Sequence, residues 1–219
     1  MRDITREVFE AVLFDNDGTL TDSTAAVERA WQAWAAHHGV PLERLVGFHG
    51  VPSRGIVAAV VDDHIDVDLA TADIDRRELE DLEGVLPLPG AAAALTALPG
   101  RAAVVTSASR ELADLRLAAA GLVAPEAYVT ADDITRGKPD PQPYLIAAER
   151  LGVDPARCLV VEDAPAGLRS GRAAGAATLA VTTTSTEQAL RDLADLVVAD
   201  LSAVVFEVVD GGVRVRVTD

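Results

Sequence analysis

Acidic, hydroxyl and amino side chains stand at the ends of short apolar runs in this chain. Residues 15–19 (Asp-Asn-Asp-Gly-Thr) follow one run, residues 106–107 (Thr-Ser) end a second and residues 162–163 (Glu-Asp) end a third. Lys138 lies in a loop beyond the run at 127–130. Parallel strands gather their carboxyl ends at one edge of a sheet, where ligands bind. The sequence therefore nominates one site made of carboxylates, hydroxyls and an ammonium group.

Asp15 and Asp17 have the types and spacing of a nucleophile and its proton-transfer partner. A carboxylate at a strand end can attack phosphorus and form an aspartyl-phosphate, which divides one difficult step into two easier ones. Two residues on, Asp17 can turn its backbone carbonyl toward a metal while its side chain exchanges a proton with the leaving oxygen. The sequence predicts this pair as the catalytic residues.

A divalent cation is expected beside this pair. Asp163 would supply a second hard oxygen ligand, and a set of carboxylates, a carbonyl and water favours Mg²⁺ over zinc. We expect Asp15, Asp17, Asp163 and Glu162 around the ion, with Glu162 either binding through water or holding the surrounding shell. The expected cofactor is Mg²⁺.

Lys138 and Ser107 are expected to orient the transferring phosphate oxygens. Each candidate has a plainer alternative, because Ser107 could cap the helix that starts near Ser109, and Glu162 and Asp163 could cap the next helix. Lys138 is the single lysine of a chain that otherwise uses arginine, and Pro139 follows it. The presence of one lysine at this position favours a functional role for Lys138 over a solvated surface lysine.

The apolar runs predict the element that positions these groups. Residues 11–14, 101–105, 158–161 and 176–181 do not alternate with polar residues, which is typical of strands buried on both faces; 196–198 is a weaker candidate. Amphipathic stretches between them predict helices over 109–120, 141–151 and 164–174. This alternation indicates an α/β fold, a Rossmann-like parallel sheet core with helices on both faces.

The segment from 22 to 86 breaks this rhythm because it holds no strand-like run. It predicts an inserted all-helical cap over residues 21–87, placed as a lid on the sheet edge, within a core of residues 1–20 and 88–219. The helices are expected over 24–38 and 52–61, with one or two more over 68–86. Near the end, valine-rich stretches around Asp-Gly-Gly at 210–212 predict a β-hairpin, as a closing edge or a contact surface.

Composition excludes several classes of partner. Asp and Glu number 35 against 19 Lys and Arg, and the net charge of −16 repels nucleic acid and anionic membranes. A phosphorylated metabolite would therefore need a locally built positive field. The single cysteine, Cys158, cannot form an internal disulfide, which favours the cytoplasm. We expect a small phosphorylated metabolite as ligand, no nucleic-acid or membrane partner, and a monomer or small homo-oligomer.

Together, the four clusters resemble the signature motifs of the haloacid dehalogenase superfamily in order, spacing and residue type. The motifs are Asp15-x-Asp17-Gly18-Thr19, then Ser107, Lys138-Pro139 and Glu162-Asp163. The helical insert stands where the C1-type caps of that family lie. The resemblance implies a Mg²⁺-dependent phosphatase that forms an aspartyl-phosphate.

Residue details separate the branches that this resemblance leaves open. Asp17 favours phosphoryl chemistry over dehalogenation, and the insert has no lysine for a Schiff base. Sugar and polyol phosphate phosphatases, such as the 2-deoxyglucose-6-phosphatase type, are the preferred likeness. A β-phosphoglucomutase-like mutase is the alternative, since Arg54 could hold a second phosphate. His49, Arg54 and Arg110 are the candidate substrate residues, and Asn16 departs from the apolar or aromatic residue common at its place.

Overall fold

The computed structural model describes residues 2–48 and 51–218. Within these residues a parallel sheet of six strands runs in the order β5-β4-β1-β6-β7-β8. The strands are β1 (Ala11–Phe14), β4 (Ala102–Val105), β5 (Ala127–Val129), β6 (Cys158–Glu162), β7 (Ala177–Val181) and β8 (Leu196–Val198). The predicted α/β fold is confirmed, including the weak candidate at 196–198.

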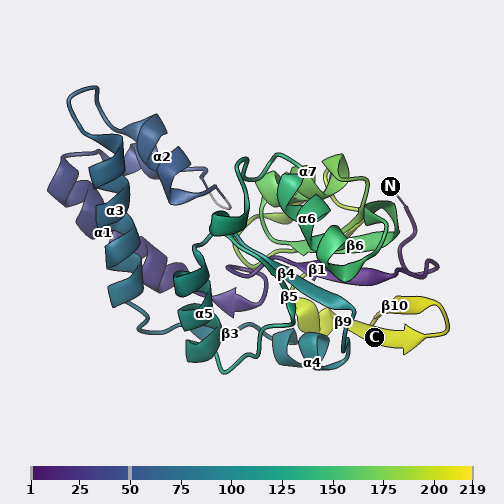
Figure 1. Ribbon diagram of the computed structural model, residues 1–219. Coiled ribbons are helices and arrows are strands. Elements are labelled where there is room, and N and C mark those ends of the chain that lie inside the picture. The colour runs from purple at the N-terminus through teal and green to yellow at the C-terminus, as the bar shows by residue number, and fades with distance from the viewer. Residues whose placement is uncertain (1, 49–50, 219) are drawn as a thin grey trace.

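Both faces of this sheet are covered, as the non-alternating runs predict. Val12 and Phe14 of β1 pack into one apolar cluster with α4 (Ala91–Thr96) and α5 (Arg110–Ala119). Leu13, with the opposite orientation, packs against α6 (Gln142–Leu151). Figure 1 shows α6 and α7 (Pro165–Ala173) on one side of the sheet and α4 on the other. A short helix, α8 (Glu187–Leu190), packs near β7.

The predicted hairpin is present and packs on the α4 side of the sheet. β9 (Val204–Val209) pairs antiparallel with β10 (Gly212–Val217). Phe206 is buried and meets Phe14 edge to face, with ring centroids 5.6 Å apart. Arg214 and Arg216 lie on the exposed face of β10. The hairpin thus closes one layer of the core.

Three helices between β1 and β4 form a separate apolar cluster: α1 (Thr24–His38), α2 (Ser53–Val60) and α3 (Val67–Glu80). The buried Trp34 indole donates a hydrogen bond of 2.8 Å to the carbonyl of Ala70, which joins α1 to α3. These helices project to one side of the sheet in Figure 1. The expectation of helix from 68 to 86 is wrong at its end, because α3 stops at Glu80.

Two short strands connect the helical segment to the sheet. β2 (Thr21–Asp22) pairs antiparallel with β3 (Leu86–Pro87), so the chain leaves the sheet and returns to it at adjacent points. The sequence did not predict these strands, nor the helices α4 and α8, because each is only two to six residues long and lacks a readable period. None of the described helices is long and apolar enough to cross a bilayer.

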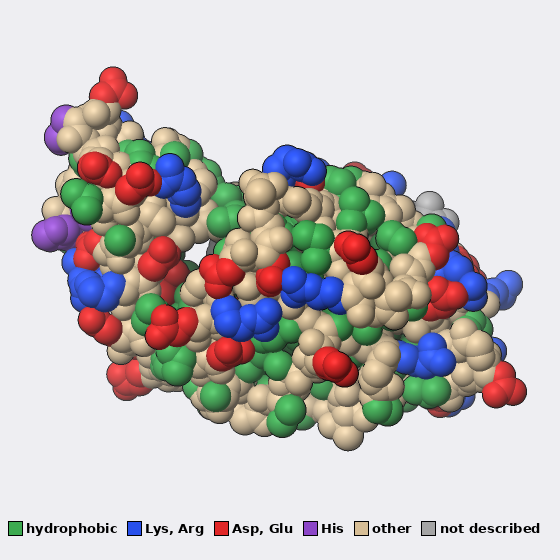
Figure 2. All heavy atoms as spheres, in the orientation of Figure 1, with side chains coloured by type: hydrophobic (Ala, Val, Ile, Leu, Met, Phe, Trp, Pro, Cys, Tyr) green, Lys and Arg blue, Asp and Glu red, His purple; other side chains and the backbone are tan. Residues whose placement is uncertain are grey.

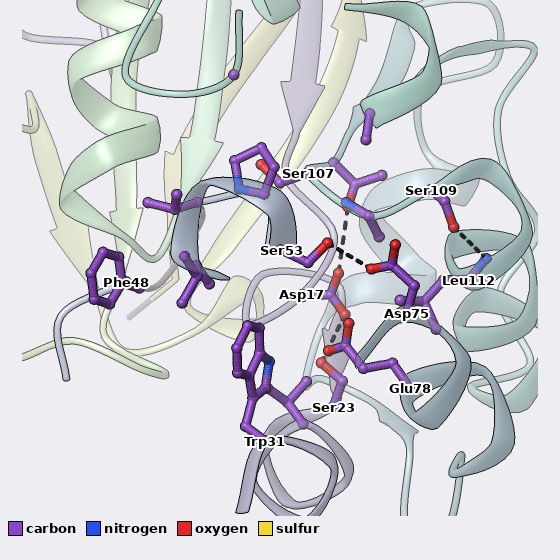
Figure 3. A pocket seen from close by; sticks show the side chains of 18 of the residues that line it. Asp17, Ser23, Trp31, Phe48, Ser53, Asp75, Glu78, Ser107, Ser109 and Leu112 are labelled. Carbon is purple, nitrogen blue, oxygen red and sulfur yellow. Dashed lines mark hydrogen bonds between the residues drawn. The ribbon is translucent and has the colours of Figure 1, made fainter. Parts of the chain in front are cut away.

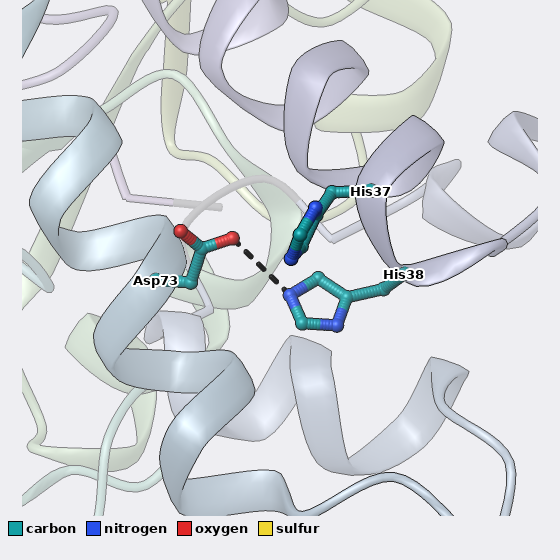
Figure 4. Close-up of side chains that lie close together, drawn as sticks. All are labelled: His37, His38 and Asp73. Carbon is teal, nitrogen blue, oxygen red and sulfur yellow. Dashed lines mark hydrogen bonds and ion pairs between the residues drawn. The ribbon is translucent and has the colours of Figure 1, made fainter.

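A polar network ties α1 to α3 on the surface of the helical segment (Figure 4). His38 Nε2 lies 3.2 Å from Asp73 Oδ2, and the His37 ring meets the His38 ring nearly at right angles. The same Asp73 carboxylate accepts hydrogen bonds from Arg77 (2.9 Å) and Arg76 (2.7 Å). These two guanidinium groups supply the positive charge that a bound metal would otherwise bring. The cluster is therefore an ion-pair network between helices.

Candidate active site

The sheet order places β1 between β4 and β6, so the polar residues that follow these strands converge. Connections run outward in both directions from β1, which makes its carboxyl end a topological switch point. Lys138 Nζ lies 2.5 Å from Asp15 Oδ1, 2.7 Å from Glu162 Oε1 and 3.0 Å from the carbonyl of Val105. Groups distant along the chain thus meet through one ammonium group.

Glu162 is buried and fully engaged. Its Oε1 also accepts a hydrogen bond of 2.8 Å from the Tyr144 hydroxyl, and its Oε2 accepts the backbone amides of Asp163 and Ala164, each at 3.2 Å. Gly167 on the first turn of α7 packs against this carboxylate so closely that a Cβ atom there would overlap it. The sequence left two roles open for Glu162, and this geometry favours holding the shell over direct metal binding.

Asp163 lies on the other side of Asp15 and contacts the loop after β1. Its Oδ1 accepts a hydrogen bond of 3.1 Å from the Thr19 hydroxyl, and its Oδ2 accepts one from Thr184. Gly18 has φ +87°, and a Cβ atom at this position would overlap the Asp163 carboxylate. Glycine is therefore required here for both backbone conformation and close approach.

The buried carboxylates of Asp15, Glu162 and Asp163 carry more negative charge than Lys138 offsets. Their ligand oxygens lie within 4.8 Å of one another. Burial, followed by the charge of Glu162, raises the pKa of both Asp15 and Asp163 above the ordinary range. Burial alone lowers the pKa of Lys138, but Asp15 and Glu162 raise it above its ordinary value. The oxygen donors and the excess negative charge fit a hard divalent cation.

Four donors hold the Asp17 carboxylate. Ser23 donates to it at 2.7 Å and Arg116 at 3.0 Å, while Asn16 and Thr106 lie at 3.3 and 3.4 Å. Asn16 is fully buried, and its amide points to Asp17 within the same loop. This arrangement gives the unusual residue at position 16 a structural role, which the sequence left open.

Arg116 is a residue that the sequence reasoning missed. It lies on the buried face of α5, one turn after Leu112, with only 5% of its side chain exposed. Besides Asp17, it pairs at 3.2 Å with Glu78 of α3. Burial, opposed by Arg116, raises the pKa of Glu78. One feature of the sequence could have identified Arg116: it stands at helical spacing from apolar positions. A charged side chain on the buried face of a helix needs buried partners of opposite charge.

A cavity of about 860 Å³ separates the helical segment from the sheet edge. Figure 2 shows the surface hollowed there, with Asp and Glu side chains gathered around the hollow. Asp15, Asp17, Ser107 and Asp163 line it from the sheet side (Figure 3 shows Asp17 and Ser107). Lys138 and Glu162 lie just behind these residues, each with 1% of its side chain exposed. The helix N-cap is Ser109 and not Ser107, so the capping alternative for Ser107 is wrong.

The predicted substrate residues have different positions. Arg54 of α2 lines the cavity, where it pairs with the exposed Asp68. Arg110 is absent from the described lining; its guanidinium stacks on the Tyr128 ring at 4.0 Å and donates to the Tyr128 carbonyl at 3.0 Å. The first turn of α5 thus directs Arg110 onto β5, and its contact with a substrate stays a prediction. His49 lies outside the described residues.

Fold and site together define an α/β enzyme whose carboxylate cluster lies at the switch point of a parallel sheet, beneath an inserted helical segment. The haloacid dehalogenase-like hydrolase family matches residues 9–175. The chain belongs to this family, which confirms the resemblance predicted from its four motifs.

Relatives in the family support the same branch. The chain is similar to hexitol phosphatase A of Escherichia coli (42% identical over 88% of this chain and 91% of the relative). It is also similar to 2-deoxyglucose-6-phosphate phosphatase 2 of Saccharomyces cerevisiae (32% identical over 88% of each chain). The solved β-phosphoglucomutase of Clostridium difficile shares the fold, with a TM-score of 0.77 at 20% identity over 89% of this chain and 92% of that one. These relatives confirm the predicted likeness to the phosphatases, and the mutase structure shows that the chain shares the fold of that group.

Proposed function

We propose that this protein is a Mg²⁺-dependent phosphatase that hydrolyses monoesters of small sugar or polyol phosphates through an aspartyl-phosphate. The observation that carries the proposal is Asp15, which Lys138 holds at 2.5 Å and which lines the cavity under the helical segment. A carboxylate fixed in this way is a pre-positioned nucleophile. The phosphatases of sugar and polyol phosphates among its relatives support the substrate class.

In the first step, an Asp15 carboxylate oxygen attacks phosphorus, and the bond between phosphorus and the ester oxygen breaks. Asp17 gives its proton to that oxygen, so that a neutral alcohol leaves. Asp17, ionised by this first step, then removes a proton from water, whose oxygen attacks the aspartyl-phosphate and releases phosphate. Asp15 returns as a carboxylate and Asp17 as an acid, so the cycle closes.

The remaining groups bind and orient the phosphate. Ser107 and Lys138 would contact its oxygens, and Glu162 with Tyr144 would hold Lys138 in place. Asp15, Asp163 and the backbone carbonyl of Asp17 would hold Mg²⁺, with Glu162 behind them. When bound, the ion supplies the positive charge that lets an anionic nucleophile approach an anionic phosphate.

Hydrolysis is favoured over the mutase alternative by the charge of the cavity. A mutase has to bind two phosphates of a bisphosphate intermediate, one of them from the cap. Arg54 is the candidate for that second contact, and in the structure it is paired with Asp68. Glu28 and Asp75 line the same side of the cavity and would repel a second phosphate.

The proposal includes an organisation for the whole chain. Residues 21–87 would act as the cap and residues 1–20 with 88–219 as the catalytic core, joined through β2 and β3. We propose a cytoplasmic enzyme, in keeping with a single, buried cysteine, Cys158, acting as a monomer or small homo-oligomer. Its partner would be a phosphorylated metabolite.

Phosphate release tests the proposal directly. Purified protein is assayed with p-nitrophenyl phosphate and a panel of sugar and polyol phosphates, with Mg²⁺ and with EDTA. We expect Mg²⁺-dependent release that Asp15→Asn and Asp17→Asn each reduce by at least about 100-fold. Asp192→Asn, a change at an exposed carboxylate, is the matched control. Wild-type rates in Asp15→Asn, or no release from any compound, would refute the proposal.

A further inference from the structure

The cap side of the cavity carries a polar pair that the reaction does not use. Ser53 on α2 donates a hydrogen bond of 2.6 Å to Asp75 Oδ1 on α3. Figure 3 shows both side chains directed into the cavity, above Asp17 and close to Glu78. Because they come from two different helices, α2 and α3, this pair forms a fixed feature of the cap side of the cavity.

Asp75 keeps acceptor capacity and negative charge at this position. Within the described part of the chain it forms no ion pair, and Ser53 engages only one of its two oxygens. Asp132 lines the cavity opposite, so two carboxylates border the same space. An ionised carboxylate is an acceptor for several hydrogen bonds, and the hydroxyl groups of a polyol are the donors that match it.

Cations that could receive a second anion are already engaged. Among the described lining residues the guanidinium groups are those of Arg54 and Arg116. Arg116 is held between Asp17 and Glu78, and Arg54 is paired with Asp68. A second phosphate or a carboxylate on the substrate would therefore have to displace Asp68 from Arg54 or meet Asp75 without a countercharge.

Apolar side chains also line the cavity. Trp31, Phe48 and Val51 line the cavity beside the Ser53–Asp75 pair. Trp31 meets Trp34 edge to face at 5.2 Å, which fixes the indole that borders the cavity. Apolar surface of this kind packs against the carbon-bound hydrogens of a sugar, whereas the polar pair can accept its hydroxyl protons.

We propose that Asp75, positioned by Ser53, is the specificity residue for the polyol part of the substrate. It selects monophosphates with an uncharged polyhydroxy end over those with a second anionic group. The inference rests on the proposed phosphatase function and adds to it the residues that recognise the substrate.

The test compares two substrates that differ in one terminal group. Glucitol 6-phosphate ends in a hydroxymethyl group and 6-phosphogluconate ends in a carboxylate, while the rest of the chain is the same. p-Nitrophenyl phosphate, which has no polyol, reports the chemistry alone. We measure kcat/KM for all three with wild type, Asp75→Asn and Ser53→Ala. Glu80→Gln, an exposed carboxylate on the same helix, is the control.

Wild type is expected to prefer glucitol 6-phosphate over 6-phosphogluconate by about 100-fold or more, because the carboxylate loses a hydrogen bond and meets a like charge. Asp75→Asn should reduce that preference at least about 10-fold and lower the ratio of glucitol 6-phosphate to p-nitrophenyl phosphate turnover. Ser53→Ala should shift both ratios in the same direction, and Glu80→Gln should leave them unchanged.

Failure of this inference is distinguishable from failure of the proposed function. Equal wild-type rates with both sugar compounds, or ratios that neither variant moves, would overturn the role of Asp75 while p-nitrophenyl phosphate turnover still shows a phosphatase. Ser53→Ala provides the test if Asp75→Asn does not fold, as circular dichroism will report. No phosphate release from any of the three would instead overturn the function.

Discussion

At the scale of single residues, the buried charges of the site hold one another in place. Lys138 is fixed by two carboxylates and a carbonyl, and Glu162 is fixed in turn by Tyr144 and two backbone amides. A buried ammonium group with this set of partners stays protonated, because loss of the proton would leave the carboxylates uncompensated. Position and charge of Lys138 therefore depend on Glu162.

Gly167→Ala tests this dependence without touching a charged group. The added methyl would overlap the Glu162 carboxylate and push it from Lys138. We expect kcat for p-nitrophenyl phosphate to fall by at least about 10-fold, because a displaced donor loses part of its effect on the transition state. Overpacking should also lower the free energy of unfolding by about 1–3 kcal/mol. Steady-state kinetics and urea denaturation measure the two effects.

Gly121→Ala is the matched control for that change. Gly121 has φ +67° and open space around it, so its alanine variant carries backbone strain of about 1 kcal/mol with no contact to the site. Its kcat should equal that of wild type. A Gly167→Ala protein that is folded and turns over at the wild-type rate would contradict the supporting role of Glu162.

At the scale of elements, helices α1 and α3 are joined by the Asp73 network and by Trp34. Burial raises the pKa of Asp73, but hydrogen bonds from Arg77 and Arg76 outweigh it and lower that pKa to about 2. In the unfolded chain the pKa of an aspartate is about 3.9. The folded state therefore binds a proton less readily than the unfolded state, and the ionised carboxylate stabilises the helical segment.

This stabilisation should be fully present above about pH 4 and lost as the pH falls toward 2. After allowance for solvent screening we expect about 1 kcal/mol at pH 7, roughly half of it gone by pH 3. Asp73→Asn removes the titrating group, so the difference in unfolding free energy between wild type and variant isolates its contribution. Urea denaturation at pH 7 and pH 3 measures that difference. If the difference in unfolding free energy between wild type and variant is the same at pH 7 and pH 3, then the charge of Asp73 does not contribute to stability.

At the scale of the whole molecule, the sheet and its site follow from patterns that the sequence displays. Non-alternating apolar runs marked the strands because a doubly covered parallel strand is buried on both faces. Polar residues after β1, β4 and β6 converge because parallel strands end at one edge. Asp15, Lys138 and Glu162 therefore lie together as the motif order indicated.

Features that depend on contacts between distant segments could not be predicted in this way. The guanidinium of Arg110 lies on the aromatic face of Tyr128, a contact that the sequence did not indicate. Arg116 carried no motif, and its role follows only from the approach of α3 to α5. Nothing local in the sequence specifies which carboxylates a buried guanidinium will meet when two parts of the chain pack together.

Arg116 links the helical segment to the sheet-bearing part of the molecule. It also contacts Asp17, the proposed acid–base residue. Its side chain extends from α5 to Glu78 on the helical segment and to Asp17 in the loop after β1. The helical segment also approaches the sheet-bearing part at Gly137, where Pro52 packs against the backbone. The arginine that orients the Asp17 carboxylate is therefore itself held by Glu78 where α3 lies on α5.

Arg116→Met should consequently affect both stability and turnover. The variant leaves Glu78 buried without its partner, which should cost about 3 kcal/mol in urea denaturation. Asp17 would lose its ion pair while retaining Ser23, so kcat should fall by about 10-fold or more as the proton donor loses its orientation. Glu78→Gln keeps the contact between Arg116 and Asp17 and serves as the comparison, with a smaller loss of kcat. If a folded Arg116→Met keeps wild-type turnover, then the contact between α3 and α5 stabilises the fold without orienting Asp17.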